Sequence, residues 1–212
     1  MQAVPGRGLW RWAHGVPDLW VAWQVVQEAR GKQVCPECKS KGRHRHISWV
    51  LKELKLKPAQ KSKALLIGGS AAELQMVESL EFDFVERMTL DNPSHGRVHL
   101  DMANMHLFTM KEFDLIVACH VLEHVRYLNQ GLLEAYRALK PGGYAIFCVP
   151  RATRNKTQGR TEPVPPGHWW KIGRDWFTYY KNVGFRLRES YGRDCPEAYG
   201  VKHDNLVSIC MK

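Results

Sequence analysis

The middle of the chain alternates short apolar segments with segments of helical pattern, and this constrains the fold more than any other feature. Strand candidates lie at residues 64–68, 84–90, 97–100, 113–119 and 144–149. Amphipathic helical patterns separate several of them, at residues 71–80 and from about 122, or slightly later, to 139. Strands that alternate with helices are typical of a parallel sheet with right-handed crossovers.

The tail changes this pattern. A helical segment at 175–183 precedes two extended segments, 184–191 and 206–211, that are joined by a loop instead of a helix. We therefore predict an α/β fold: a Rossmann-like, doubly wound, seven-stranded sheet that is parallel except for an antiparallel C-terminal strand. Residues 63–212 would form this domain, and residues 1–62 a small helical cap with helix candidates at 17–31 and 47–56.

The net charge of +10 is unevenly distributed along the 212 residues. Residues 1–63 hold 13 Lys or Arg and 4 Asp or Glu, residues 64–150 hold 6 and 11, and residues 151–212 hold 12 and 6. A basic total is typical of proteins that bind nucleic acid or acidic surfaces. Here the middle is acidic, so the basic flanks need a separate explanation.

Several protein classes are disfavoured by composition. No apolar run of about 18 residues indicates a membrane-spanning helix, and residues 1–15 lack the apolar run of a secretory signal. The six cysteines are too few and scattered for a disulfide framework. Cys148 and Cys210 lie in apolar runs and are interpreted as small buried residues. These features predict a reducing, cytoplasmic location.

Ligands of doubly wound sheets bind at the carboxyl ends of the strands, and these positions carry suitable groups here. Gly68-Gly69-Ser70 follows the first strand, Asp91 the second, Asp101 the third, and Cys119-His120 the fourth. Singly, each has a structural explanation: a tight turn for the glycines, turn formation for Asp91 and a helix cap for Asp101. In this order they predict an adenosine-like ligand, with Asp91 on the ribose hydroxyls.

On these residues the chain resembles class I S-adenosylmethionine-dependent methyltransferases of the ubiquinone-biosynthesis type (methyltransferase type 11). The stretches that carry the resemblance are ALLIGGS (64–70), FDLIVACHVLEHV (113–125) and YRALKPGGYAI (136–146). The segment CPEC (35–38) with RHR (43–45) also resembles a short leader of one bacterial-type subgroup, so the resemblance covers roughly residues 35–212. The family usually has an acid before a Gly-x-Gly-x-Gly motif, whereas Leu66-Ile67 precede Gly-Gly-Ser here.

The resemblance implies S-adenosylmethionine as cofactor and assigns its subsites. Gly68, Gly69 and Ser70 would pass under the methionine part, and Asp91 would bind the ribose. The remaining residues would border the adenine (Asp101, Met102) and the sulfonium (Cys119, His120).

Methyl transfer from a sulfonium is an in-line displacement that needs alignment and, for some acceptors, a base. The candidate bases are His120, after the fourth strand, His124, four residues later, and His168, in the loop after the fifth strand. His120 has the alternative of only shaping the cofactor pocket. His124 would share a helical face with His120 if the helix began that early, and packing is its favoured role.

Two metal hypotheses accompany these residues, although no metal is assigned. Some relatives, including small-RNA 2′-O-methyltransferases, carry Glu-x-x-Glu-His and hold a divalent ion where this chain has His120-x-x-Glu123-His124. The resemblance thus admits a softer ion with His168 as a further ligand. Cys35 and Cys38 with His44 and His46 offer zinc ligands at unusually short spacing, against a plain structural turn.

The basic flanks are expected to border the acceptor. The N-terminal tryptophans are interpreted as a helical lid or a contact with a second subunit, with membrane-surface binding or base stacking as alternatives: Trp10, Trp12, Trp20 and Trp23. Residues 151–160 would form a basic acceptor loop. The sequence therefore predicts a methyltransferase acting at oxygen on a small or glycan-like, anionic acceptor. An RNA methyltransferase and a non-catalytic cofactor-binding scaffold are the rivals.

Overall fold

The fold is taken from a computed structural model that describes residues 34, 40–56, 58–89, 98–150, 154–165, 167–202 and 205–212. Among the helices in these parts of the chain, none is long and apolar enough to cross a membrane. The expected helix at 17–31, the N-terminal tryptophans and the cysteines at 35 and 38 lie outside the described residues.

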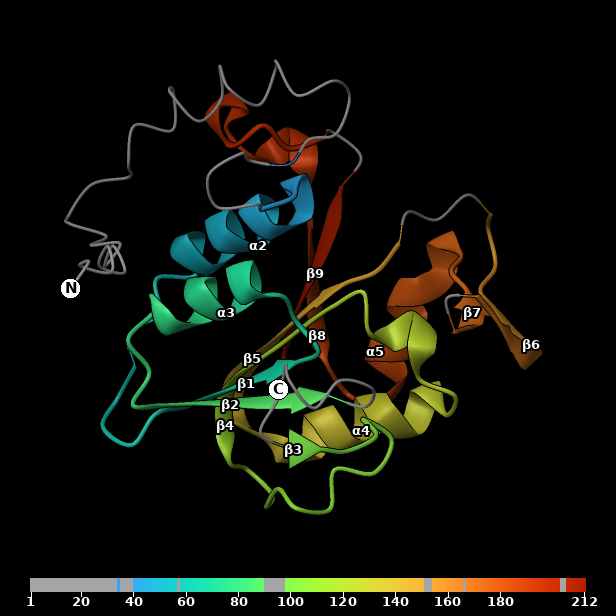
Figure 1. The fold of residues 1–212 in the computed structure, drawn as a ribbon, viewed down its shortest axis with the longest axis horizontal. Coiled ribbons are helices and arrows are strands. Elements are labelled where there is room, and N and C mark those ends of the chain that lie inside the picture. The colour runs from blue at the N-terminus through green and yellow to red at the C-terminus, as the bar shows by residue number, and fades with distance from the viewer. Residues whose placement is uncertain are drawn as a thin grey trace, which may run out of the picture.

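A seven-stranded sheet forms the centre of the molecule, with strand order β3-β2-β1-β4-β5-β9-β8 (Figure 1). Pairing is parallel from β3 to β5, and β9 runs antiparallel to both β5 and β8. The doubly wound sheet with one antiparallel C-terminal strand is thus confirmed. The strands are β1 (Lys63–Ile67), β2 (Phe84–Thr89), β3 (Val98–His99), β4 (Phe113–Cys119), β5 (Leu139–Cys148), β8 (Arg186–Tyr191) and β9 (Leu206–Met211).

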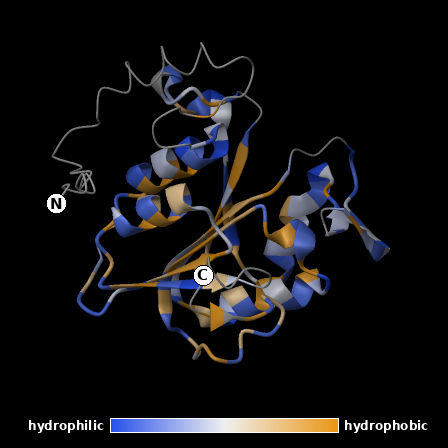
Figure 2. Cartoon of the chain, in the orientation of Figure 1, coloured by the Kyte–Doolittle hydropathy of each residue, from blue (hydrophilic) through white to orange (hydrophobic). Residues whose placement is uncertain are grey.

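Alternate residues of the central strands enter two apolar cores, one on each face of the sheet. In β1, Leu65 and Ile67 join the core under α4 (Leu128–Ala138) and α5 (Phe177–Asn182). Ala64 and Leu66 join the core under α2 (Gly42–Glu53) and α3 (Ala71–Glu78). Figure 2 shows the apolar central strands between these helices. Burial on both faces explains why the central strands are apolar without interruption.

The helix α2 packs on the same face as α3, and the two lie side by side (Figure 1). Ile47, Val50 and Leu51 of α2 are buried against the sheet. The helix begins at Gly42, five residues before the expected start. This part of the expected N-terminal cap therefore shares a core with the strands. The RHR segment, residues 43–45, lies in the first turn of α2.

Three segments differ from expectation. The helix expected from about residue 122 or slightly later is α4, which begins at Leu128 after a 3-10 turn, Leu122–His124, and an extended Val125. The indole Nε1 of Trp170 donates to the Val125 carbonyl at 2.8 Å, which removes that carbonyl from helical bonding. The expected turn at 141–143 is a bulge within β5, where the register against β4 shifts.

The third difference is a hairpin, β6 (Gln158–Val164) and β7 (His168–Lys171), where a loop was expected. It lies beyond α5 in Figure 1. Its contacts with the turn Leu122–His124 bring His168 to the carboxyl edge of the sheet. Prolines at 163, 165 and 166 disfavour a strand prediction for this segment, so the sequence did not indicate the hairpin.

Candidate active site

The glycine turn after β1 forms as predicted from its sequence. Gly68 and Gly69 both have positive φ, at 68° and 87°, and a Cβ on Gly69 would lie 2.8 Å from Leu66 Cδ2. Ser70 then caps α3, because its backbone N–H and hydroxyl donate to Glu73 Oε2 at 2.6 and 2.9 Å. A side chain at either glycine would strain the turn, so the backbone here stays open to close approach of a ligand.

The first and fourth strand ends meet at this edge. Ile67 of β1 is level with Ala118 of β4, and a Cβ on Gly68 would lie 3.1 Å from Val121 Cγ2. The glycine turn therefore faces the residues that follow β4. This is the juxtaposition that the order of the strand ends predicts.

The predicted adenine and ribose residues are only partly described. Asp91 lies outside the described residues. Asp101 follows β3, and its Oδ1 accepts from the Ala103 N–H at 2.8 Å, which stabilises a turn and not the helix start that was its alternative. Met102 is 3% exposed and packs in the core under α4.

Cys119 and His120 end β4 beside Cys148, the last residue of β5, and their donor atoms all lie within 4.8 Å of one another. The Cys119 thiol donates to the Cys148 sulfur, which raises the pKa of Cys119 well above its usual value. The same bond, with a further one from His120, outweighs burial and lowers the pKa of Cys148 to about 6. The sequence identified Cys148 as buried but not as a partner of His120.

His120 adopts a left-handed backbone conformation, with φ of 55°, which is rare for a residue other than glycine and is found at functional sites. Burial disfavours its imidazolium, but hydrogen bonds to Cys148 and Glu123 outweigh burial and raise its pKa to about 9. At neutral pH His120 therefore carries a proton, which fits a charge-bearing pocket residue better than a general base.

A second cluster joins Glu123, His124 and His168, whose donor atoms lie within 4.8 Å of one another. Glu123 is 1% exposed; its Oε1 lies 3.2 Å from His120 Nδ1, and its Oε2 has no hydrogen-bond partner in the described part of the chain. The rings of His124 and His168 meet edge to face at 4.6 Å. The expected helical face shared by His120 and His124 does not form. The third member of this cluster is His168, which β7 places beside His124.

The charge state of His168 is set by its surroundings. Burial, and next the neighbouring His124, lower the pKa of His168 from its usual value. A lowered pKa favours the neutral imidazole, which is the form that a general base needs.

These residues also fit a divalent ion. One buried carboxylate and two imidazoles, with His120 beside them, form a donor set of the kind that binds zinc and other first-row transition ions. The unpartnered Glu123 oxygen is the observation that favours such an ion. The cluster thus has two chemical capacities: proton transfer through His168 or metal binding.

A basic hollow of about 210 Å³ adjoins the second cluster. It lies beyond the end of β5, and the Nε of Arg160 is buried without a hydrogen-bond partner in the described residues. The sequence predicted basic residues here but not their arrangement on a hairpin. The hollow is lined by Pro150, Arg154, Arg160, His168, Trp170, Lys171 and Ile172.

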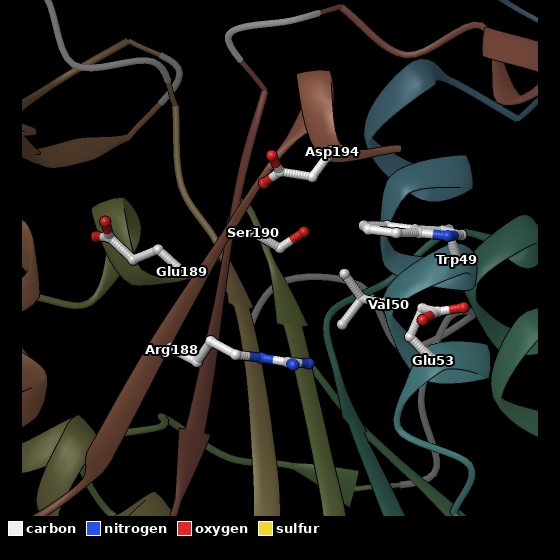
Figure 3. Close-up of a pocket in the computed structure, with 7 residues that line it drawn as sticks. All are labelled: Trp49, Val50, Glu53, Arg188, Glu189, Ser190 and Asp194. Atoms are coloured by element: carbon white, nitrogen blue, oxygen red, sulfur yellow. The ribbon is translucent and has the colours of Figure 1, made fainter. Parts of the chain in front are cut away.

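Another hollow, of about 180 Å³, lies between α2 and the edge strand β8 (Figure 3). Figure 3 shows the Ser190 hydroxyl directed toward α2, while Glu189 points to the other side of the strand. No predicted site residue lines this hollow. It is lined by Trp49, Val50, Glu53, Arg188, Glu189, Ser190 and Asp194.

The two described residues of the zinc hypothesis lie in the first turns of α2. His46 Nε2 is 2.9 Å from the Ser190 hydroxyl, and His44 Nε2 is 3.8 Å from Glu73 Oε1. Burial lowers the pKa of each imidazole to about 4. In these positions His44 and His46 contact two different elements, α3 and β8.

A family model and several solved structures match the chain. Residues 68–147 match the model of a methyltransferase domain family. No curated protein sequence matches the chain. The matched residues span β1's glycine turn, the histidine-bearing segment after β4 and most of β5.

Solved structures share the fold at low identity. An S-adenosylmethionine-dependent methyltransferase from Archaeoglobus fulgidus is 14% identical, with TM-score 0.57, and the match covers 80% of this chain and 94% of that one. A putative methyltransferase from Haloferax volcanii, solved with its Trm112 activator, is 12% identical, with TM-score 0.53 and coverage of 80% and 90%. A phosphoethanolamine N-methyltransferase from Haemonchus contortus, in complex with S-adenosyl-L-methionine, is 15% identical, with TM-score 0.52 and coverage of 79% and 52%. Residues 68–147 thus resemble a methyltransferase domain, and the chain has the fold of S-adenosylmethionine-dependent methyltransferases.

Proposed function

We propose that this chain, a methyltransferase-domain enzyme, transfers the methyl group of S-adenosylmethionine to an oxygen of a small anionic acceptor. The observation that carries the proposal is the basic hollow with the neutral His168 at its wall, directly beyond the strand ends where the cofactor is expected. A methyl donor and an acceptor would meet at this edge of the sheet.

The cofactor would lie across the strand ends in the order of the sequence motifs. Gly68, Gly69 and Ser70 would pass under its methionine part, and Asp91 would bind the ribose. Asp101 and Met102 would border the adenine, and Cys119 and His120 the sulfonium. The Cys148 thiolate beside His120 would balance the imidazolium charge under the cationic sulfur.

The reaction would be a single displacement. The acceptor oxygen attacks the methyl carbon as the carbon–sulfur bond breaks, which yields the methyl ether and S-adenosylhomocysteine. His168 accepts the hydroxyl proton and becomes an imidazolium. The buried Glu123 carboxylate, which already favours the protonated form of His168, would stabilise this charge.

A divalent ion is the second candidate for the same cluster, favoured by the unpartnered oxygen of Glu123. Glu123, His124 and His168 would hold it. When bound, it would lower the pKa of an acceptor hydroxyl and stabilise the oxyanion. A chelator distinguishes the two: activity through a His168 base persists in EDTA, and activity through the ion is lost.

The acceptor charge has a direct test in Arg160 and Lys171. Each change to glutamine should raise KM for a hydroxylated carboxylate or a phosphate monoester on the order of tenfold, with kcat nearly unchanged, because uniform binding is lost. Neutral amides of the same carboxylates should show no such change. The measurement is initial rates of S-adenosylhomocysteine release over a panel of these matched acceptors.

Arg186→Gln, on the exposed part of β8, is the control and should leave KM unchanged. Equal KM effects on charged and neutral acceptors would contradict an anionic acceptor. Salt-sensitive RNA binding that the same two changes abolish would favour the RNA methyltransferase. Cofactor binding without turnover on any acceptor would favour a scaffold.

A further inference from the structure

The methionine part of the expected cofactor carries two charges, an α-ammonium and an α-carboxylate, which need partners in a buried site. The strand end beneath it offers none. Leu65, Leu66 and Ile67 are buried and apolar, and the next two residues are glycines. The helices α2 and α3 lie side by side on one face of the sheet (Figure 1), and the first turn of each carries a charged side chain, Arg43 in α2 and Glu73 in α3.

Glu73, in the first turn of α3, is a buried carboxylate with an open position. It is 4% exposed, and its Oε2 is occupied by the two hydrogen bonds from Ser70. Its Oε1 has no hydrogen-bond partner in the described residues. No lysine or arginine forms an ion pair with it within these parts of the chain.

The neighbouring His44 does not supply the missing positive charge. Its Nε2 lies 3.8 Å from Glu73 Oε1, which is too far for a hydrogen bond. Burial lowers the pKa of His44 to about 4, so its ring is neutral at physiological pH. A buried carboxylate facing a neutral ring favours a cationic ligand.

Arg43 precedes His44 in the first turn of α2 and offers the opposite charge. Its Nε is buried without a hydrogen-bond partner among the described residues. Its positive charge lowers the pKa of both Cys119 and Cys148, at the ends of β4 and β5, after the larger effects there of hydrogen bonding and burial. Arg43 therefore lies near the strand ends expected under the cofactor.

Arg45, two residues later, has a different role. Its Nη2 donates to the Gly200 carbonyl at 2.9 Å, and its Nη1 to the Ser40 carbonyl at 3.0 Å. Of the two arginines that flank His44, Arg45 thus ties α2 to the C-terminal region. Arg43 is left for a ligand.

We propose that Glu73 binds the α-ammonium of the methionine part of S-adenosylmethionine and that Arg43 binds its α-carboxylate. This assignment rests on the proposed function. It places the charged contacts on two helices instead of on the strand end, and it explains why a chain without an acid before its glycines keeps a buried acid one turn later.

Binding of three ligands tests the assignment by isothermal titration. Of the α-ammonium and the α-carboxylate, S-adenosylhomocysteine carries both groups and decarboxylated S-adenosylmethionine keeps only the ammonium. The third ligand, 5′-methylthioadenosine, has neither group. Arg43→Gln should weaken S-adenosylhomocysteine at least tenfold and leave the other two unchanged. Glu73→Gln should weaken the first two and leave 5′-methylthioadenosine unchanged, since the amide oxygen still accepts from Ser70.

Lys52→Gln on α2 and Glu78→Gln on α3 are matched controls at the other ends of the same helices and should change nothing. Thermal unfolding of each variant confirms the fold. If either site variant weakens 5′-methylthioadenosine as much as S-adenosylhomocysteine, or leaves S-adenosylhomocysteine unchanged, the assignment is wrong. If the unmodified protein binds none of the three, the proposed function itself is wrong.

Discussion

Replacing His168 with alanine is expected to lower kcat by about 10²- to 10⁴-fold, the usual contribution of a general base. The dissociation constant of S-adenosylhomocysteine should stay unchanged, because His168 lies on β7, outside the strand ends assigned to the cofactor. The protonation state supports this role, since burial and His124 lower the pKa of His168. Turnover by the unmodified enzyme should fall as the pH drops below the pKa of His168, where the base is protonated.

Single-turnover rates and titration calorimetry on the same samples separate these effects. His106→Ala, at an exposed histidine in the loop after β3, is the matched control and should keep full activity. Added imidazole should restore part of the lost rate. Loss of cofactor affinity in the His168 variant would reassign the residue to the pocket, and loss of wild-type activity in EDTA would assign the cluster to a metal.

Acid should destabilise the fold through His44 and His46. Both are buried, and burial lowers the pKa of each from 6.5 to about 4. Between these values the unfolded chain binds protons that the folded chain excludes, so the free energy of unfolding falls as the pH is lowered through this window. The stability is fully present above pH 6.5. The expected loss between pH 7 and pH 5 is about 2 kcal/mol for each histidine.

Urea unfolding across this pH range measures the loss. His46→Gln keeps a nitrogen to meet the Ser190 hydroxyl on β8, the residue that faces α2 in Figure 3, and removes the titrating ring. We expect its loss of unfolding free energy between pH 7 and pH 5 to be smaller than that of the unmodified protein by the contribution of His46, about 2 kcal/mol. His106→Gln should leave the pH dependence intact. A His46 variant with the full pH dependence would contradict a neutral, buried His46.

The sequence predicted the elements that depend on local pattern. The apolar strands from 113–119 and 64–68, the glycine turn and the antiparallel final pair follow from alternation and composition, and the structure confirms them. The strand-end rule also placed Gly68 near Cys119 and His120 without knowledge of the strand order.

The parts that the sequence did not reveal depend on contacts between distant segments. The hairpin that carries His168 pairs Gly159 with Trp170, and prolines within it oppose a strand prediction. The break before α4 depends on the indole of Trp170, 45 residues away from Val125. The charges of His120 and His168 follow from burial and neighbours, which no pattern in the chain specifies.

Titration of the full chain with S-adenosylhomocysteine tests the central claim most directly. One molecule should bind per chain, with a dissociation constant on the order of micromolar, and S-adenosylmethionine should compete for the same site. Failure of both ligands to bind below the millimolar range would contradict the assignment of this sheet edge to the cofactor.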